Sequence, residues 1–296
     1  MKRILWATTL VLALHGLAHA GEVELDRAGL TLKAQLETGP EWPRGPVVLM
    51  THGTLAHGRM EIMTALQQAF SERGLSSLAI SLSLGLPARQ GMYDCATPHR
   101  HRHADALDEI DAWMDWLARQ GVAEVVLLGH SRGGNQAAWY AAERDRPALD
   151  KLLLLAPMTW DAAAEATAYR QRYGVELGPL LGRMQALVDG GQADAMQAGV
   201  DFIYCEDTQV TPAAFVAYYG DDPRRDTPAL LPRLAKPVLV VAGSEDQVVK
   251  GLEARVQPVA DGARVRLAVI DGADHFFRDL YIDDVADLAV AFIQDD

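Results

Sequence analysis

The sequence predicts an α/β fold with a mostly parallel, doubly wound sheet of about eight strands and helices on both faces. Short apolar runs alternate with segments of helical period along most of the chain, which is the pattern of βαβ units. Residues 158–232 interrupt that alternation, because they read as helices broken by Gly and Pro with no obvious strand. We therefore expect one α/β domain over residues 21–296, with a helical insertion over about residues 158–232.

The expected elements follow the chain in order. Two N-terminal strands, 22–26 and 30–37, are expected to pair as an antiparallel edge. The other strands are expected at 46–51, 75–81, 124–128, 151–156, 237–242 and 265–270, with helices at about 59–73, 104–119 and from 132 onward. The helix 104–119 has the clearest period, since one face carries its large apolar residues, Leu107, Ile110, Trp113, Met114 and Leu117. Within the insertion we expect helices at about 160–173 and 179–189.

The first 20 residues are predicted to be a secretory signal peptide. Lys2 and Arg3 form a charged start, residues 4–14 an apolar stretch, and Ala18-His19-Ala20 an Ala-x-Ala cleavage site. The apolar stretch is short of the roughly 20 residues that span a bilayer, and no later segment is longer and equally apolar. We therefore expect an exported protein, periplasmic or extracellular, with no stable membrane insertion.

The charge balance excludes some partners. The chain has 27 basic and 40 acidic residues, a net charge of −13, which becomes −15 when Lys2 and Arg3 leave with the signal peptide. Such an acidic protein does not favour nucleic acid or anionic membranes. We expect a small-molecule substrate and no nucleic-acid partner, and the sequence leaves the oligomeric state open.

The segment Gly129-His130-Ser131-Arg132-Gly133 follows an apolar run and has the pattern Gly-x-Ser-x-Gly. Glycines two places either side of a serine let a strand turn sharply into a helix, so that the serine stands at the strand tip. The N–H groups at the start of that helix would face negative charge developing on a substrate carbonyl oxygen. The pattern predicts a nucleophilic Ser131, with a packing turn as the alternative.

A serine hydroxyl needs a base, and the base an orienting acid. His275 follows the expected strand 265–270, and Asp246 follows the expected strand 237–242. Glu245 and Asp161 are alternative acids, the first because it neighbours Asp246 and the second because it follows the preceding strand. His275 could instead be a loop histidine bonded to a nearby carboxylate.

The order Ser131, Asp246, His275, each after its own strand, resembles the alpha/beta-hydrolase family over nearly the whole mature chain, and within it secreted bacterial serine esterases and lipases. The resemblance implies that His275 acts as general base and then general acid, with Asp246 holding its tautomer. It implies a carboxylic ester hydrolase that works through an acyl-Ser131 intermediate, without cofactor or metal. The insertion then resembles the cap of this family.

The resemblance also implies an oxyanion site. His52-Gly53-Thr54 after the strand 46–51 looks like the oxyanion loop of the family, so the donors would be the backbone N–H groups of Thr54 and Arg132. Supporting roles are implied for the motif residues His52, Gly53, Gly129 and Gly133. A tight turn that needs glycine for steric reasons is the alternative for His52-Gly53.

The chain has two cysteines, Cys95 and Cys205. An oxidising compartment permits them to pair, and both segments should open on the edge of the sheet where ligands bind. We expect a disulfide that ties two walls of the pocket together, with two buried thiols as the alternative.

His99, His101 and His103 alternate along one segment, which invites a metal interpretation. No cysteine or carboxylate in the local sequence completes a ligand set, so we expect a solvated loop at the pocket rim that attracts an anionic substrate. His130 is interpreted as a packing choice within the serine turn, and His57 likewise carries no metal prediction. Five aromatic residues of the insertion are candidate substrate contacts, with cap packing as the alternative: Trp160, Tyr204, Phe215, Tyr218 and Tyr219.

Two further functional hypotheses stay open. A peptidase or amidase of the same fold would share the triad chemistry, because leaving-group preference depends on the cap. A non-catalytic binding protein would have lost a member of the triad, and Ser131, Asp246 and His275 are all present.

Overall fold

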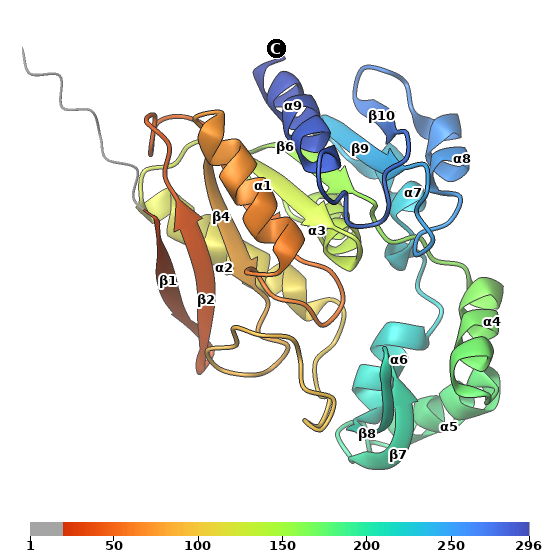
Figure 1. Cartoon of the computed structure of the whole chain (residues 1–296). Coiled ribbons are helices and arrows are strands. Elements are labelled where there is room, and N and C mark those ends of the chain that lie inside the picture. Colours follow the sequence, from red (N-terminus) through yellow and green to blue (C-terminus); the bar gives the residue numbers. More distant parts are fainter. Residues whose placement is uncertain (1–19, 296) are drawn as a thin grey trace, which may run out of the picture.

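The computed structural model describes residues 20–295. Its centre is an eight-stranded sheet in the order β1-β2-β4-β3-β5-β6-β9-β10 (Figure 1). The strands are β1 (Ala20–Arg27), β2 (Leu30–Glu37), β3 (Val47–Thr51), β4 (Ser76–Ser81), β5 (Val125–His130), β6 (Leu149–Leu155), β9 (Val238–Gly243) and β10 (Val265–Ile270). β1 and β2 pair antiparallel at one edge, β2 is antiparallel to β4, and the other neighbours are parallel. The predicted fold class is confirmed.

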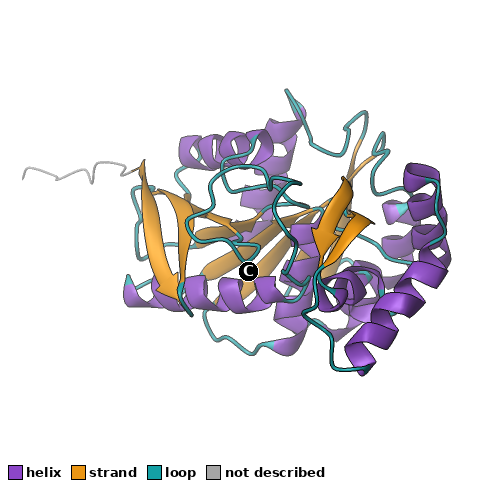
Figure 2. Cartoon of the chain, turned by 90° about the horizontal axis from the view of Figure 1, so that it is seen from below, coloured by secondary structure: helices purple, strands orange, loops and turns teal. Residues whose placement is uncertain are grey.

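Helices cover both faces of the sheet (Figures 1 and 2). α1 (Glu61–Glu72) and α9 (Tyr281–Gln294) pack on one face, where Phe70 and Phe292 are buried with the alternate residues of the central strands. α2 (Asp105–Arg119), α3 (Arg132–Glu143) and α8 (Leu252–Val256) pack on the other face. The central strands are buried on both sides, so their sequences read as continuous apolar runs.

The segment 158–232 contains more than helices. It forms α4 (Ala162–Tyr173), α5 (Leu177–Asp189), β7 (Gln197–Phe202), β8 (Cys205–Val210), α6 (Pro212–Tyr219), the 3-10 turns η1 (Pro223–Arg225) and η2 (Leu231–Arg233), and α7 (Thr227–Leu230). β7 and β8 pair as an antiparallel hairpin separate from the main sheet (Figure 1). The expectation of a purely helical insertion was therefore wrong.

The missed hairpin has a physical explanation. Its two-residue turn is Ile203-Tyr204, whereas turns of this kind are normally recognised by Asn-Gly or Asp-Gly. Its strands carry Gly199, Asp201 and Asp207, residue types that disfavour strands. Contacts with distant parts of the chain therefore decide this local structure.

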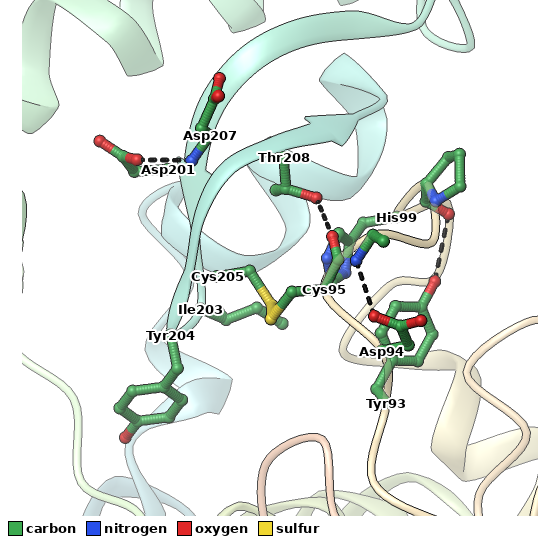
Figure 3. Close-up of a disulfide and its surroundings, with 12 residues drawn as sticks. Tyr93, Asp94, Cys95, His99, Asp201, Ile203, Tyr204, Cys205, Asp207 and Thr208 are labelled. Carbon is green, nitrogen blue, oxygen red and sulfur yellow. Dashed lines mark hydrogen bonds between the residues drawn. A yellow bond between two sulfur atoms is a disulfide. The ribbon is translucent and has the colours of Figure 1, made fainter.

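Cys95 and Cys205 form a disulfide across 110 residues of sequence, with Cα atoms 5.3 Å apart. The bond joins the loop after β4 to the first residue of β8, so the expected pairing of the two cysteines is confirmed (Figure 3). The expected role of the loop after β4 as a wall of the pocket is not, because no residue of that loop lines the cleft beside Ser131. Two bonds continue the link, because the His99 N–H donates to the Gln209 oxygen at 2.7 Å and the Thr208 hydroxyl donates to the Cys95 oxygen at 2.7 Å. The hairpin is thus fastened to a core loop.

The disulfide fits an oxidising environment, where such bonds persist. The predicted signal peptide lies almost entirely outside the described residues and stays a prediction. Among helices of residues 20–295, none is long and apolar enough to cross a membrane.

Candidate active site

Loops after four strands meet at one edge of the sheet. They follow β3, β5, β9 and β10 and carry Thr54, Ser131, Asp246 and His275, respectively. These strands are parallel, so their carboxyl ends lie at the same edge, where ligands bind in folds of this class. A cleft of about 380 Å³ opens there, and its lining includes Ser131, Thr54 and the residues directly after Asp246.

Ser131 occupies the sharp turn between β5 and α3. Its φ of 57° and ψ of −121° lie in a region that non-glycine residues rarely adopt. A Cβ added at Gly129 would overlap the backbone of Gly133, and one added at Gly133 would overlap the carbonyl oxygen of His52. The turn therefore needs glycine at both positions, which is the geometry expected from the Gly-x-Ser-x-Gly pattern.

His275 and Asp246 are hydrogen-bonded. His275 Nδ1 lies 2.8 Å from Asp246 Oδ2, and the two side chains are 4% and 5% exposed. The other carboxylate oxygen accepts the N–H groups of Val248 and Val249 at 2.7 and 2.8 Å. Burial alone would raise the pKa of Asp246, but the hydrogen bonds from His275 and from this backbone outweigh it and hold that pKa below its usual value. An ionised Asp246 can hold the imidazole in one orientation.

The two alternative acids lie elsewhere. Glu245 is exposed although it neighbours Asp246. Asp161 is also exposed, and its side chain caps α4 by accepting the N–H of Ala164. Of the three carboxylates, only Asp246 is bonded to His275.

Thr54 and Arg132, whose N–H groups are the expected oxyanion donors, are joined by their side chains. Arg132 Nε donates to Thr54 Oγ1 at 2.9 Å, and both residues line the cleft. Arg132 is the first residue of α3, where backbone N–H groups have no partner within the helix. Gly53 packs closely here, because a Cβ added to it would lie 3.3 Å from the Ser131 Cβ.

His52 supports this loop from below. The side chain is buried, its Nδ1 bonds to the Gly53 oxygen at 2.8 Å, and its Nε2 accepts the Leu82 N–H at 3.0 Å. Burial, followed by the nearby Arg89, lowers the pKa of His52 well below its usual value. A neutral His52 therefore ties the β3 loop to the end of β4.

His130 does more than fill space. It is buried, its Nε2 donates to the His275 carbonyl oxygen at 2.8 Å, and the two imidazole rings lie 4.8 Å apart. Burial lowers the pKa of His130 to about 3, so the ring stays neutral. The residue before Ser131 thus contacts the loop that carries His275.

The expected solvated loop of His99, His101 and His103 was wrong. All three residues are at most 2% exposed. The ring of His99 packs against Phe202, that of His101 against Tyr218, and that of His103 against Trp139 of α3. His101 lies between neighbours, 3.2 Å from His99 and 2.8 Å from the Tyr218 hydroxyl. Burial lowers the pKa of His99 to about 4 and of His101 to about 3. The three histidines alternate because they pack between the core and the segment 158–232. The local sequence does not indicate this contact.

His103 connects this cluster to the first residues of α3. Its Nε2 donates to Asn135 Oδ1 at 2.8 Å, and its Nδ1 accepts Arg132 Nη1 at 3.1 Å. Burial and the adjacent Arg132 hold the pKa of His103 well below its usual value. Within residues 20–295 no group of His, Cys, Asp and Glu is arranged to hold a metal ion.

Two of the five aromatic candidates, Tyr204 and Tyr219, line the cleft. Phe215 and Tyr218 are instead buried in the apolar cluster of the segment 158–232, and Trp160 packs beneath the guanidinium of Arg225.

Other lining residues went unnoticed in the sequence. Glu165, Tyr169 and Arg172 occupy one face of α4 at spacings of four and three residues, and Tyr173 is adjacent. Such helical spacing is a signal that the sequence contains. The sequence does not indicate that this face of α4 is directed toward the cleft.

A family model described as alpha/beta hydrolase fold matches residues 46–279. A search of curated protein sequences finds no significant relative. Several solved structures resemble most of the chain. Est1E from Butyrivibrio proteoclasticus with bound ferulic acid is 21% identical, with a TM-score of 0.65, covering 92% of this chain and 97% of that one.

Two others are more distant in sequence. A dienelactone hydrolase from Anabaena variabilis is 17% identical, with a TM-score of 0.55 and coverage of 93% and 96%. An esterase from Pyrococcus furiosus is 15% identical, with a TM-score of 0.59 and coverage of 94% and 90%. At such identities the structural likeness speaks for the fold, and together with the matching family model it establishes that the chain belongs to the alpha/beta hydrolase fold family.

Proposed function

We propose that this protein is a serine hydrolase that cleaves carboxylic esters through an acyl-Ser131 intermediate, with Ser131, His275 and Asp246 as its catalytic triad. The observation that carries the proposal is the shared edge of the sheet. Ser131 stands at a strained turn in a cleft, and the adjacent His130 contacts the loop of His275, which is bonded to Asp246.

In the first half of the reaction, Ser131 Oγ attacks the carbonyl carbon of the ester. Its proton passes to His275 Nε2, because Nδ1 is bonded to Asp246, and the C=O electron pair moves to the oxygen. The N–H groups of Thr54 and Arg132 stabilise that oxyanion, and one such donor contributes about 3 to 4 kcal/mol to a transition state of this kind. The C–O bond to the alcohol then breaks, and His275 returns the proton to the alcohol oxygen.

In the second half, water attacks the acyl carbon. His275 accepts a proton from the water, the bond from carbon to Ser131 Oγ breaks, and the proton goes back to Ser131. The products are an alcohol and a carboxylic acid, and no oxidant or reductant is needed. Asp246 stays ionised throughout, since its pKa is held below the usual value.

The proposal includes export. Residues 1–20 would act as a signal peptide, and the disulfide supports an oxidising destination, either periplasmic or extracellular. Edman sequencing of protein recovered outside the cytoplasm should start at Gly21. Similar solved structures include a dienelactone hydrolase and an esterase, whose activities are consistent with ester cleavage by this protein.

The direct test is covalent labelling by a fluorophosphonate probe. We expect the wild type to be labelled and Ser131→Ala and His275→Ala to be unlabelled, while the control Ser71→Ala on α1 labels normally. Matched p-nitrophenyl esters and p-nitroanilides should then show the ester cleaved faster. Labelling that persists in Ser131→Ala, or a folded wild type that neither labels nor hydrolyses any ester, would contradict the proposal.

A further inference from the structure

The tip of the β7–β8 hairpin has an unusual backbone. Ile203 has a φ of 33° and Tyr204 a φ of 77°, so two non-glycine residues occupy the left-handed region in succession. A β-branched residue rarely adopts such a conformation, and strained residues of this kind cluster at functional sites. The tip is therefore a place to look for binding.

Distant residues hold this tip in place. The Ile203 N–H donates to the Tyr219 hydroxyl at 3.0 Å, and the Tyr204 N–H donates to the Tyr173 hydroxyl at 2.9 Å. The next residue, Cys205, is bonded to Cys95 of the core loop. Two tyrosine hydroxyls and a disulfide thus fix a turn that its own residues disfavour.

The Tyr204 ring itself remains accessible. It is 52% exposed and, as Figure 3 shows, is directed away from the disulfide. The Arg172 guanidinium lies over the ring, 4.4 Å from its centre, and within residues 20–295 Arg172 takes part in no salt bridge. Both side chains line the cleft that contains Ser131. The hairpin turn therefore places an aromatic ring at the cleft, and α4 places the Arg172 cation beside that ring.

We propose that Tyr204 and Arg172 form a subsite for an aromatic ring of the substrate, so that the enzyme prefers esters whose acyl or alcohol part ends in such a ring. This inference rests on the proposed ester hydrolysis. Aromatic rings pair with tyrosine in stacked or edge-to-face geometry, which a saturated ring cannot match. Fixing Tyr204 in advance removes the cost of ordering it on binding.

The test compares esters that differ only in the ring. Methyl 3-phenylpropanoate and methyl 3-cyclohexylpropanoate probe the acyl side, while 2-phenylethyl and 2-cyclohexylethyl acetate probe the alcohol side. In both pairs the ring is remote from the reacting carbonyl, so intrinsic reactivity is matched. We expect kcat/KM to favour the phenyl member of at least one pair by about two- to tenfold, from the usual strength of an aromatic pair.

The variants separate the ring from the fold. Tyr204→Gly removes the ring at a position whose φ favours glycine, so the protein should fold and the phenyl preference should disappear. Tyr204→Phe should keep the preference. Ala28→Gly, at the φ of 49° in the β1–β2 turn away from the cleft, is the matched glycine control and should also keep it.

A binding measurement separates the subsite from the catalytic proposal. For the acyl side, calorimetry on Ser131→Ala compares 3-phenylpropanoate with 3-cyclohexylpropanoate. For the alcohol side, it compares 2-phenylethanol with 2-cyclohexylethanol. The aromatic ligand should bind more tightly in the pair that matches the side on which the ring enters. Ring preference in binding without ester turnover by the wild type would sink the hydrolase proposal alone. Equal handling of both rings in every pair, or an unchanged preference in Tyr204→Gly, would overturn the subsite.

Discussion

Ser131 and Tyr204 are two non-glycine residues at positive φ that line one cleft, yet their turns are stabilised in different ways. The core turn at Ser131 depends on neighbours in sequence, since Gly129 and Gly133 leave room for the backbone. The hairpin turn at Tyr204 depends on distant partners, two tyrosine hydroxyls and a disulfide.

The difference separates two kinds of positioning. A turn built by adjacent glycines keeps its shape as long as the strand and helix around it form. A turn built by tertiary contacts keeps its shape only while the segment 158–232 stays attached to the core. We therefore expect changes in the core turn and its partners to abolish chemistry, and changes at the attachment of the hairpin to alter stability and binding.

The largest effect should come from the core side, through Asp246→Asn. The amide can still accept the N–H groups of Val248 and Val249, but it cannot hold the His275 tautomer as a carboxylate does. We expect kcat for ester hydrolysis to fall about 10⁴-fold with little change in melting temperature. The adjacent, exposed Glu245→Gln is the control and should retain activity. An Asp246→Asn variant that keeps the kcat of the wild type would contradict the proposed role of Asp246.

The next effect concerns the attachment of the hairpin. Replacing Cys95 and Cys205 together with serine removes a link across 110 residues. The chain-entropy relation gives a loss of roughly 4 to 5 kcal/mol in the free energy of unfolding. This value is an upper bound, because strain in the native bond would reduce the loss. Denaturant titration of the oxidised wild type and the double variant measures it. Equal midpoints and slopes for the two proteins would mean that the disulfide does not stabilise the fold by restricting the unfolded chain.

Acid should lower the stability of the folded protein through its buried histidines, among them His99 and His101 beside the hairpin. Burial lowers the pKa of His99 to about 4 and of His101 to about 3, so below pH 6.5 the unfolded chain binds more protons. Stability is complete above pH 6.5 and falls toward pH 4, by at most about 1.4 kcal/mol per pH unit for each histidine. The lowered pKa of Asp246 acts in the same direction but only below its ordinary value near pH 3.8.

Thermal melts across this range, compared with His101→Gln, measure the contribution of one histidine. The variant should lose stability less steeply between pH 6.5 and 4, because one fewer imidazole must stay neutral on folding. Parallel curves for the two proteins would show that His101 does not titrate on unfolding in this range.

The smallest effect should come from His103, which lies between the Ser131 turn and the segment 158–232. His103 accepts a hydrogen bond from Arg132 Nη1 and donates one to Asn135, so it contacts the residue whose N–H group is proposed as an oxyanion donor. We expect His103→Phe, which keeps the packing against Trp139, to lower kcat about fivefold with KM nearly unchanged, since a lost hydrogen bond costs about 1 kcal/mol. His103→Gln should recover part of the loss. A change in KM alone would assign His103 to binding instead.

The main sheet could be anticipated because its signals are local. Apolar runs, the period of the helix at Leu107 to Leu117 and the glycines beside Ser131 each act over a few residues. Asp246, which the resemblance to the family favours among the candidate acids, is the carboxylate that lies within hydrogen-bond distance of His275. The roles of these residues await the labelling experiment.

The hairpin and the buried histidines could not be anticipated in the same way. Ile203-Tyr204 lacks the usual turn residues, and His99, His101 and His103 have the polar character of a solvated loop. Their structures arise from partners far away in sequence, such as Tyr173, Tyr219 and Tyr218.

The fold class follows from short-range periodicity, and the sharp turn at Ser131 follows from the steric need for glycine. The placement of Ser131, Asp246 and His275 after separate strands and the presence of two cysteines can likewise be read directly from the chain. Only the tertiary structure decided which face of α4 meets the cleft, that a hairpin presents Tyr204 there, and that the three histidines are buried. Burial and hydrogen bonding where the segment 158–232 contacts the core depend on residues from both parts of the molecule. The local sequence of one part does not contain the residues of the other.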